Sequence, residues 1–260
     1  FYFIIFCSIY CVKSKKHELK GNCPDDHKFQ SPINIRKESP TIKTEFPALQ
    51  LDGFNSLTDI TITNNGHTLM SMQAQSASIK GGPLKEVYNF AQLHFHWGSR
   101  DNVGSEHQID SKKFPMEGHF VFSRSYQKNT NPTMKDYTNE IKSTKACNVE
   151  EETVKRTELN GNRCDKFKKR STYSEPDLSS EQKITINVVV GVLFAISTNA
   201  TRYDLLEKAN DVVEVNRTIE VKGDYISQFV FSMSLNNYFT YSGSLTTPPY
   251  STNVIWIVLR

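Results

Sequence analysis

The sequence predicts a single, mainly β domain with short helices. Runs of β-branched and aromatic residues separated by turn residues dominate the chain, and no segment has a long helical period. A chain of 260 residues is long enough to bury one sizeable core. Its net charge of +3 comes from interspersed positive and negative residues, so the composition gives no reason to expect a nucleic-acid surface.

The chain opens with ten almost wholly apolar residues, followed by lysines at positions 13, 15 and 16. This stretch is too short to span a bilayer and is typical of the apolar part of a secretory signal, although a buried strand is the alternative. We therefore predict a partial signal-peptide-like segment over residues 1–20, a domain over 21–260, and a location outside the cell or on the extracellular face of the membrane. The sequons Asn199-Ala200-Thr201 and Asn216-Arg217-Thr218 agree with a secreted glycoprotein.

The chain contains five cysteines. Cys7 and Cys11 would leave with a cleaved signal. Cys147 and Cys164 lie in one polar segment and could close a short loop. Cys23 has no obvious partner.

Strands are expected wherever apolar, β-branched or aromatic runs end at turn residues. The turn Asn64-Asn65-Gly66 ends the first clear run, Gly98 ends another, and a double proline precedes the last. The expected strands cover Ile60–Thr63, Leu93–Trp97, Met116–Phe122, part of the apolar run Ile184–Ile196, and Val254–Leu259.

A polar stretch at about 127–182 interrupts this pattern. It is rich in Lys, Glu, Asn, Ser and Thr and has few large apolar residues, so it predicts a solvated or disordered insertion. The basic cluster at 166–170 could be a binding tail, but the acidic residues at 150–152 offset its charge.

Three histidines form the pattern most typical of chemistry. In a strand, side chains alternate between faces, so His94 and His96 point the same way as Gln92. In the next strand Glu117 and His119 share a face. If the two strands are neighbours, three imidazoles converge on one point.

Three neutral imidazoles suit zinc and leave a fourth tetrahedral position open, as in catalytic sites. Gln92 and Glu117 are natural acceptors for the ring N–H groups and would fix the ring tautomers. The alternative is that these are ordinary core or surface histidines.

Six motifs follow one another along the chain: Gln30–Ile35, Asn64–His67, Gln92–Gly98, Gly104–His107, Glu117-x-His119 and Gly243–Pro249. They occur in the order found in the α-class carbonic anhydrases, and over residues 24–126 and 183–260 the chain resembles that family in its secreted or extracellular form. The resemblance implies a large central, mostly antiparallel twisted sheet. The chain ends at Arg260, where the family continues, so we expect a C-terminally truncated sequence whose membrane anchor, if any, lies beyond it.

The resemblance implies Zn2+ as cofactor, with His94, His96 and His119 as ligands. The implied activity is the reversible hydration of carbon dioxide to bicarbonate and a proton by zinc-bound hydroxide. Thr246 would accept a hydrogen bond from that hydroxide and donate one to Glu106. The alternative is a weak or inactive carbonic-anhydrase-like binding module, but such members typically lack one or more ligand histidines.

The resemblance also implies an apolar wall for carbon dioxide at Val121, Val189, Leu245 and Trp256, although ordinary core positions would look the same. Thr247 would contact bicarbonate.

His67 matches the family's proton shuttle, and an imidazole titrating near neutrality suits that task. The chain departs from the family at three other positions. Tyr250 stands where secreted relatives carry the partner of Cys23, and Gly118 and Met70 replace larger or more polar residues.

Overall fold

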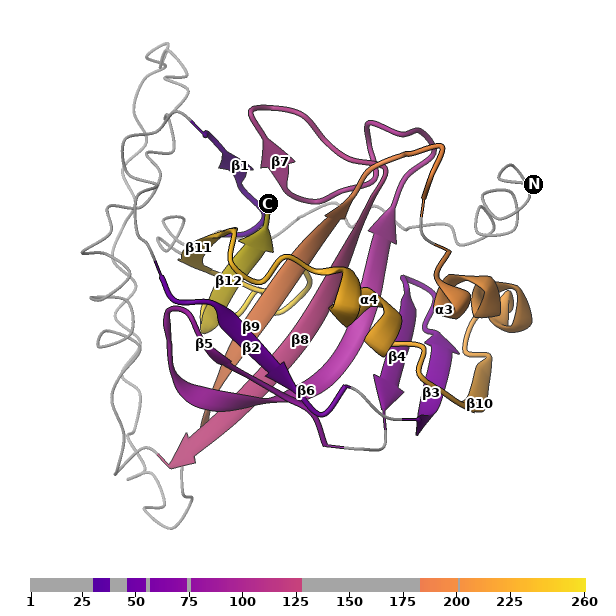
Figure 1. The fold of residues 1–260 in the computed structure, drawn as a ribbon, viewed down its shortest axis with the longest axis horizontal. Helices are drawn as coiled ribbons and strands as arrows, with labels where there is room; N and C mark the ends of the chain where they lie inside the picture. The colour runs from indigo at the N-terminus through magenta and orange to yellow at the C-terminus, as the bar shows by residue number, and fades with distance from the viewer. Residues whose placement is uncertain (1–29, 38–45, 55–56, 74–75, 128–182, 201) are drawn as a thin grey trace, which may run out of the picture.

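The computed structural model describes residues 30–37, 46–54, 57–73, 76–127, 183–200 and 202–260, which form a large twisted sheet with short helices (Figure 1). The predicted mainly β class is therefore confirmed. The helical elements are α3 (Asp204–Glu207), the 3-10 helix η2 (Lys208–Val212) and α4 (Ser227–Ser232). The strands are β1 (Asn34–Ile35), β2 (Leu49–Asp52), β3 (Thr58–Asn64), β4 (Leu69–Gln73), β5 (Ser78–Gly81), β6 (Leu84–Trp97), β7 (Gln108–Ile109), β8 (Met116–Gln127), β9 (Lys183–Phe194), β10 (Thr218–Gly223), β11 (Tyr238–Gly243) and β12 (Val254–Leu259).

The main sheet has the strand order β10-β3-β4-β6-β8-β9-β12-β11, and β5 joins β2 to β6. Its neighbours are antiparallel except for β12 and β9, which run parallel. The small pair β1–β7 is also parallel. The expected mostly antiparallel sheet is thus confirmed, with β6, β8 and β9 as its long central strands (Figure 1).

The expected strands lie within observed ones. Val254–Leu259 is β12 itself, and the expected runs at Leu93–Trp97 and Met116–Phe122 are parts of the longer β6 and β8. Strand β9 covers most of the apolar run Ile184–Ile196 and ends at Phe194, two residues before the end of that run. The signal-like segment at 1–20, all five cysteines and residues 128–182 lie outside the described residues, so those expectations stay predictions.

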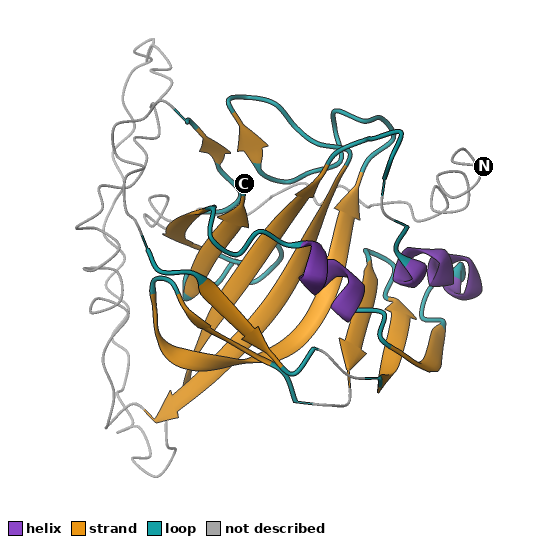
Figure 2. Cartoon of the chain, in the orientation of Figure 1, coloured by secondary structure: helices purple, strands orange, loops and turns teal. Residues whose placement is uncertain are grey.

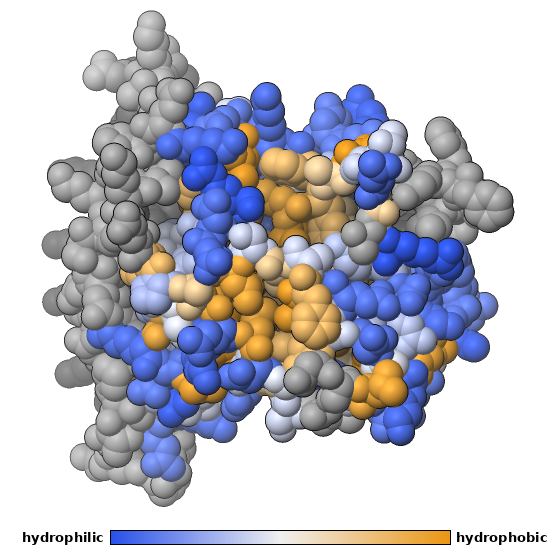
Figure 3. Space-filling view, in the orientation of Figure 1, coloured by the Kyte–Doolittle hydropathy of each residue, from blue (hydrophilic) through white to orange (hydrophobic). Residues whose placement is uncertain are grey.

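Alternation along the central strands produces two separate cores. On one face Leu93, Phe95 and Phe120 pack with Phe229 of α4 in the larger core. Figure 2 shows α4 lying across this face, and Figure 3 shows apolar side chains gathered around the middle of it. On the opposite face Val189 and Trp256 belong to a second, smaller core. The central strands are therefore held from both sides.

Gly118 lies on the larger-core face of β8, where aromatic rings come close. A Cβ atom at this position would lie 3.3 Å from ring carbons of both Phe95 and Phe194. The absence of a side chain therefore lets these two rings pack against the backbone of the strand that also carries His119.

Among the described residues, no helix is long and apolar enough to cross a membrane.

Candidate metal centre

The pairing of β6 with β8 brings the three histidines together. In this antiparallel pair His94 lies opposite His119 and His96 lies opposite Glu117. A register shift between Phe90 and Gln92 precedes this stretch, beyond which the pairing is regular. Because directly opposite residues share a face of the sheet, all three imidazoles project from the same side.

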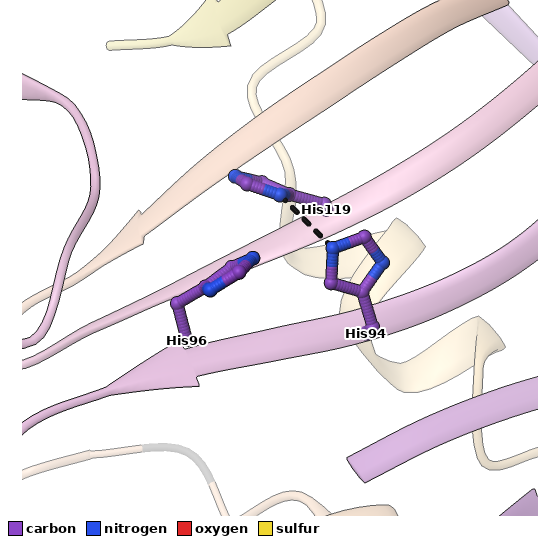
Figure 4. A group of neighbouring side chains, drawn as sticks. All are labelled: His94, His96 and His119. Carbon is purple, nitrogen blue, oxygen red and sulfur yellow. Dashed lines mark hydrogen bonds between the residues drawn. The ribbon is translucent and has the colours of Figure 1, made fainter. Parts of the chain in front are cut away.

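The imidazoles converge from two strands onto one point (Figure 4). One nitrogen from each of His94, His96 and His119 lies within 4.8 Å of the others. Nδ1 of His119 lies 3.2 Å from Nε2 of His94. His119 is almost completely buried, whereas the other two rings are partly exposed.

Hydrogen bonds on the outer side of two rings fix their tautomers. His94 Nδ1 lies 2.8 Å from Oε1 of Gln92, and His119 Nε2 lies 2.8 Å from Oε1 of Glu117. Both partners are acceptors, so these ring nitrogens carry the protons. The inward nitrogens, His94 Nε2 and His119 Nδ1, therefore present lone pairs to each other.

Burial keeps the His94 and His96 rings neutral. It is the main cause that lowers the pKa of His94 well below its usual value, and the neighbouring imidazoles add to it. Burial, followed by the electrostatic effect of His119, lowers the pKa of His96 to about 3. Neutral imidazoles are the form that binds metals.

These features fit a zinc ion. Two lone pairs face each other across 3.2 Å with no proton available between them, and among the described residues Nε2 of His96 is buried without a hydrogen-bond partner. Zinc–nitrogen bonds of about 2.0–2.1 Å in a tetrahedral arrangement place two ligand nitrogens roughly 3.3 Å apart. A cation bound by all three rings would satisfy every inward nitrogen.

Glu117 connects the imidazole cluster to Glu106 and His107. Its Oε1 also lies 2.7 Å from Nδ1 of His107, and its Oε2 accepts the backbone N–H groups of Glu106 and His107 at 2.8 Å each. Burial raises the pKa of Glu117, but the hydrogen bonds from His107 and His119 outweigh it and hold the pKa well below its usual value. His107, Glu117 and His119 could also be read as a metal-binding group, but their contacts are donor–acceptor pairs that need no ion.

Glu106 lies beside the imidazoles of His96 and His119. Its Oε2 is 3.6 Å from Nε2 of His96 and is buried without a hydrogen-bond partner among the described residues. Burial raises the pKa of this carboxyl, whereas His119 and a hydrogen bond from the Thr246 side chain act in the opposite direction. The structure therefore brings Thr246, Glu106 and the imidazole cluster together.

A chain of hydrogen bonds behind Glu117 includes residues to which sequence reasoning assigned no role. His107 Nε2 lies 2.7 Å from the Tyr241 hydroxyl, which donates to Ser31 Oγ at 2.9 Å. Ser31 Oγ in turn accepts the backbone N–H of Ser244 at 3.1 Å. His107 could have been noticed because it follows Glu106 in a recognised motif, but no sequence signal connects it with Tyr241 or Ser31.

The residues predicted to form the apolar wall lie in one cluster. Val189 and Trp256 are buried members of the smaller core, and Val121 and Leu245 pack against it while remaining partly exposed. The indole N–H of Trp256 donates to the carbonyl of Ser244 at 3.0 Å, so this polar group is already satisfied. Thr247 is exposed, two positions after Leu245.

His67 is exposed in the turn between β3 and β4. Its backbone N–H donates to the side-chain oxygen of Asn65 at 3.0 Å. The next residue ties the turn to β6, the strand that carries His94 and His96: the Thr68 hydroxyl accepts the N–H of Phe95 at 3.1 Å and donates to the carbonyl of the same residue. His67 therefore directly precedes Thr68, whose side chain hydrogen-bonds the backbone of Phe95, the residue between His94 and His96.

The chain is similar in sequence to known carbonic anhydrases. The sequence profile of the eukaryotic-type carbonic anhydrases matches residues 13–149 and 166–260. The chain is 28% identical to mouse carbonic anhydrase 7 over 236 residues and 29% identical to the human protein of that name over 234 residues; each match covers 89% of this chain and 70% of the relative. It is 27% identical to human mitochondrial carbonic anhydrase 5B over 234 residues, covering 89% of this chain and 59% of that protein.

Proposed function

Because the chain belongs to the eukaryotic-type carbonic anhydrase family, we propose that it catalyses the reversible hydration of carbon dioxide to bicarbonate and a proton, with zinc held by His94, His96 and His119. The observation that carries this proposal is the pair of inward lone pairs on His94 and His119, 3.2 Å apart, beside the unpartnered Nε2 of His96. When bound, zinc supplies a Lewis acid that makes water nucleophilic at neutral pH.

Gln92 and Glu117 act by orienting the ligands. Each accepts a ring N–H and thereby keeps the opposite nitrogen of the same ring available to the metal. The charged acceptor Glu117 also makes the His119 ring a stronger electron donor than a neutral acceptor would.

We propose that Thr246 and Glu106 together admit only an oxygen that carries a proton to the position beside Thr246. While the Glu106 carboxylate accepts a hydrogen bond from the Thr246 hydroxyl, the Thr246 oxygen has only lone pairs left for another partner. It can then accept a hydrogen bond from an O–H group but cannot donate one. Thr247, exposed nearby, is proposed to contact bicarbonate.

The apolar cluster supports carbon dioxide as the substrate. Val121, Val189 and Leu245 offer no hydrogen-bond donors, and the one donor of Trp256 is bound to Ser244. A small apolar molecule therefore loses nothing by leaving water to lie against this wall.

His67 is proposed to carry the proton to solvent. Its ring is exposed, while its backbone is attached to the ligand-bearing strand through Thr68. An imidazole exchanges protons with buffer near neutral pH.

The retained ligands argue against a binding module without activity. All three imidazoles, together with both acceptors Gln92 and Glu117, are present and in contact. A chain selected only for binding would have no need to keep this set intact.

We further propose that the protein is secreted or lies on the extracellular face of the membrane, on the strength of the apolar opening residues and the two sequons. Fractionation of the native cells, with protease protection, tests this. Recovery in mitochondria, the compartment named for human carbonic anhydrase 5B, would overturn it.

Stopped-flow measurement of carbon dioxide hydration tests the enzymatic proposal, with zinc content determined on the same sample and a sulfonamide as control. We expect sulfonamide-sensitive hydration with stoichiometric zinc. Stoichiometric zinc without hydration would refute the activity while leaving the metal centre in place. A folded protein without zinc would refute both and favour the binding module.

A further inference from the structure

The sequon Asn216-Arg217-Thr218 has no part in the proposed reaction, yet its surroundings are well defined. Asn216 is exposed in a turn between η2 and β10, closed by a hydrogen bond from the N–H of Arg217 to the carbonyl of Glu214 at 3.0 Å. Its φ angle of 66° lies in the left-handed region, which asparagine adopts more readily than most residues.

The side-chain amide of Asn216 is available for modification. In the part of the chain that the structure describes, Asn216 hydrogen-bonds through its backbone N–H, which donates to the carbonyl of Asn64 at 2.7 Å. The flanking residues Glu214, Val215 and Arg217 are exposed as well. A bulky group on the amide would therefore displace no core side chain.

The position in the sheet also leaves space. Within the described sheet β10 is the terminal strand and pairs only with β3 (Figure 1). The side of the molecule near α3 and β10 is mostly polar in Figure 3, with small apolar patches toward β10. A hydrophilic oligosaccharide suits such a surface at the beginning of an edge strand, where it would also hinder pairing with another chain.

We propose that Asn216 is an N-glycosylation site whose oligosaccharide stands against the turn that carries His67. In the modification, the side-chain nitrogen of Asn216 forms a bond to the anomeric carbon of a lipid-diphosphate-linked oligosaccharide. The bond from that carbon to the diphosphate breaks, the amide nitrogen loses one proton, and the lipid diphosphate leaves. This inference rests on the proposed secretory route and is independent of the proposed activity.

Folding sets the order of events. In the folded chain Thr218 is the first residue of β10, lies opposite Thr63, and its hydroxyl is 3.0 Å from that of Thr63. Transfer to the sequon requires the threonine hydroxyl, so the sugar is attached before β10 pairs with β3. The second sequon, at Asn199, ends at Thr201, which lies outside the described residues. It serves as the control site for the variants of Asn216 below.

The placement beside His67 follows from contacts between the two turns. The N–H of Asn64 donates to the carbonyl of Arg217 at 3.0 Å, next to the bond from Asn216 already described. A Cβ on Gly66 would lie 3.0 Å from Cγ1 of Val215. The turn bearing the sugar thus packs directly on Asn64–His67.

Peptide mapping of protein isolated from its native cells, before and after treatment with a peptide N-glycosidase, is the first test. We expect the peptide containing Asn216 to carry an oligosaccharide that the enzyme removes, leaving aspartate at the attachment position. An unmodified Asn216 peptide would overturn the proposal, whether or not Asn199 is modified and whether or not hydration activity is found.

Variants made in a secretory host separate the sequon from the fold. Asn216→Asp tolerates the left-handed backbone and should abolish the modification at this site, whereas Asn199→Asp should leave it unchanged. Thr218→Ser keeps a hydroxyl for both the sequon and Thr63 and should remain modified; Thr218→Val should not. Because occupancy is read on peptides, poor folding of a variant does not obscure the result.

The reaction of His67 with diethyl pyrocarbonate tests where the sugar stands. We expect His67 to react severalfold more slowly in the glycosylated protein than in Asn216→Asp, measured on the peptide that contains it. Equal rates in an occupied protein would overturn the placement against the His67 turn.

Discussion

Replacing Glu117 by glutamine removes one negative charge and one acceptor from the point where four donors meet. The rings of His107 and His119 point at one carboxylate oxygen at 2.7 and 2.8 Å, and two backbone N–H groups point at the other at 2.8 Å each. Glutamine has a single acceptor oxygen. Whichever way its amide turns, its NH2 group faces two of these donors.

An imidazole can move its proton from one ring nitrogen to the other, whereas a backbone N–H group always remains a donor. If the glutamine oxygen takes the two backbone N–H groups, its NH2 faces the rings, and His119 must move its proton from Nε2 to Nδ1. That proton then occupies the nitrogen that points at His94. We therefore expect Glu117→Gln to weaken zinc binding by about 10–100-fold, or about 1.4–2.7 kcal/mol.

The opposite amide orientation predicts a different result. Leaving two donors without a charged acceptor costs about 1.5–3 kcal/mol each, so folding stability would fall by roughly 3–6 kcal/mol. Zinc affinity from chelator competition and denaturant unfolding of the metal-free protein distinguish the two orientations. Gln92→Ala is the control, because it removes a neutral acceptor from His94 and should weaken zinc binding less.

Zinc affinity within twofold of the parent protein, together with a large loss of stability, would refute this reasoning. That outcome would mean that the glutamine oxygen accepts the Nε2–H of His119 and that its NH2 group faces the two backbone N–H groups. A large loss of affinity with a small loss of stability is the expected result.

Four further changes have definite expected outcomes. His119→Ala removes one of three ligands and should abolish tight zinc binding; stoichiometric zinc after dialysis would contradict the assignment. His67→Ala should retain zinc but slow hydration in weak buffer, with rescue by added imidazole, and an unchanged rate at every buffer concentration would rule out the shuttle. Gly118→Leu should lower the urea midpoint through a loss of about 1–3 kcal/mol, because the new side chain meets two phenylalanine rings. In metal-free protein, burial lowers the pKa of His96 to about 3, so the unfolded chain binds a proton that the folded chain does not. Unfolding free energy should therefore fall by about 1.4 kcal/mol per pH unit for this residue as pH drops from about 6.5 toward 3, and equal stability at pH 7 and 5 would contradict this.

The strand pair at the centre could be predicted because period-two alternation is a local property. The spacing of His94 and His96, and of Glu117 and His119, assigns each side chain to a face without knowledge of any partner strand. The adjacency of the two strands could only be stated as a condition. The structure satisfies it with His94 directly opposite His119.

Contacts between distant segments could not be predicted in the same way. Tyr241 and Ser31 are 210 residues apart, and their bond depends on how β11 and the chain near β1 pack. The packing of the turn around Asn216 on Asn64 likewise follows from β10 pairing with β3. A sequon or a tyrosine carries no periodic signal that would reveal its neighbours.

The Thr68 hydroxyl, which bonds both the N–H and the carbonyl of Phe95, couples the turn to β6, so we expect the two to open together in local unfolding. At this position a single side chain does what a neighbouring strand does elsewhere, since β4 pairs with β6 only at Met70 and Ser71. Any fluctuation that detaches the turn exposes the backbone of Phe95, between two of the proposed zinc ligands. Hydrogen-exchange protection of that backbone amide therefore reports on the turn and on the metal centre together.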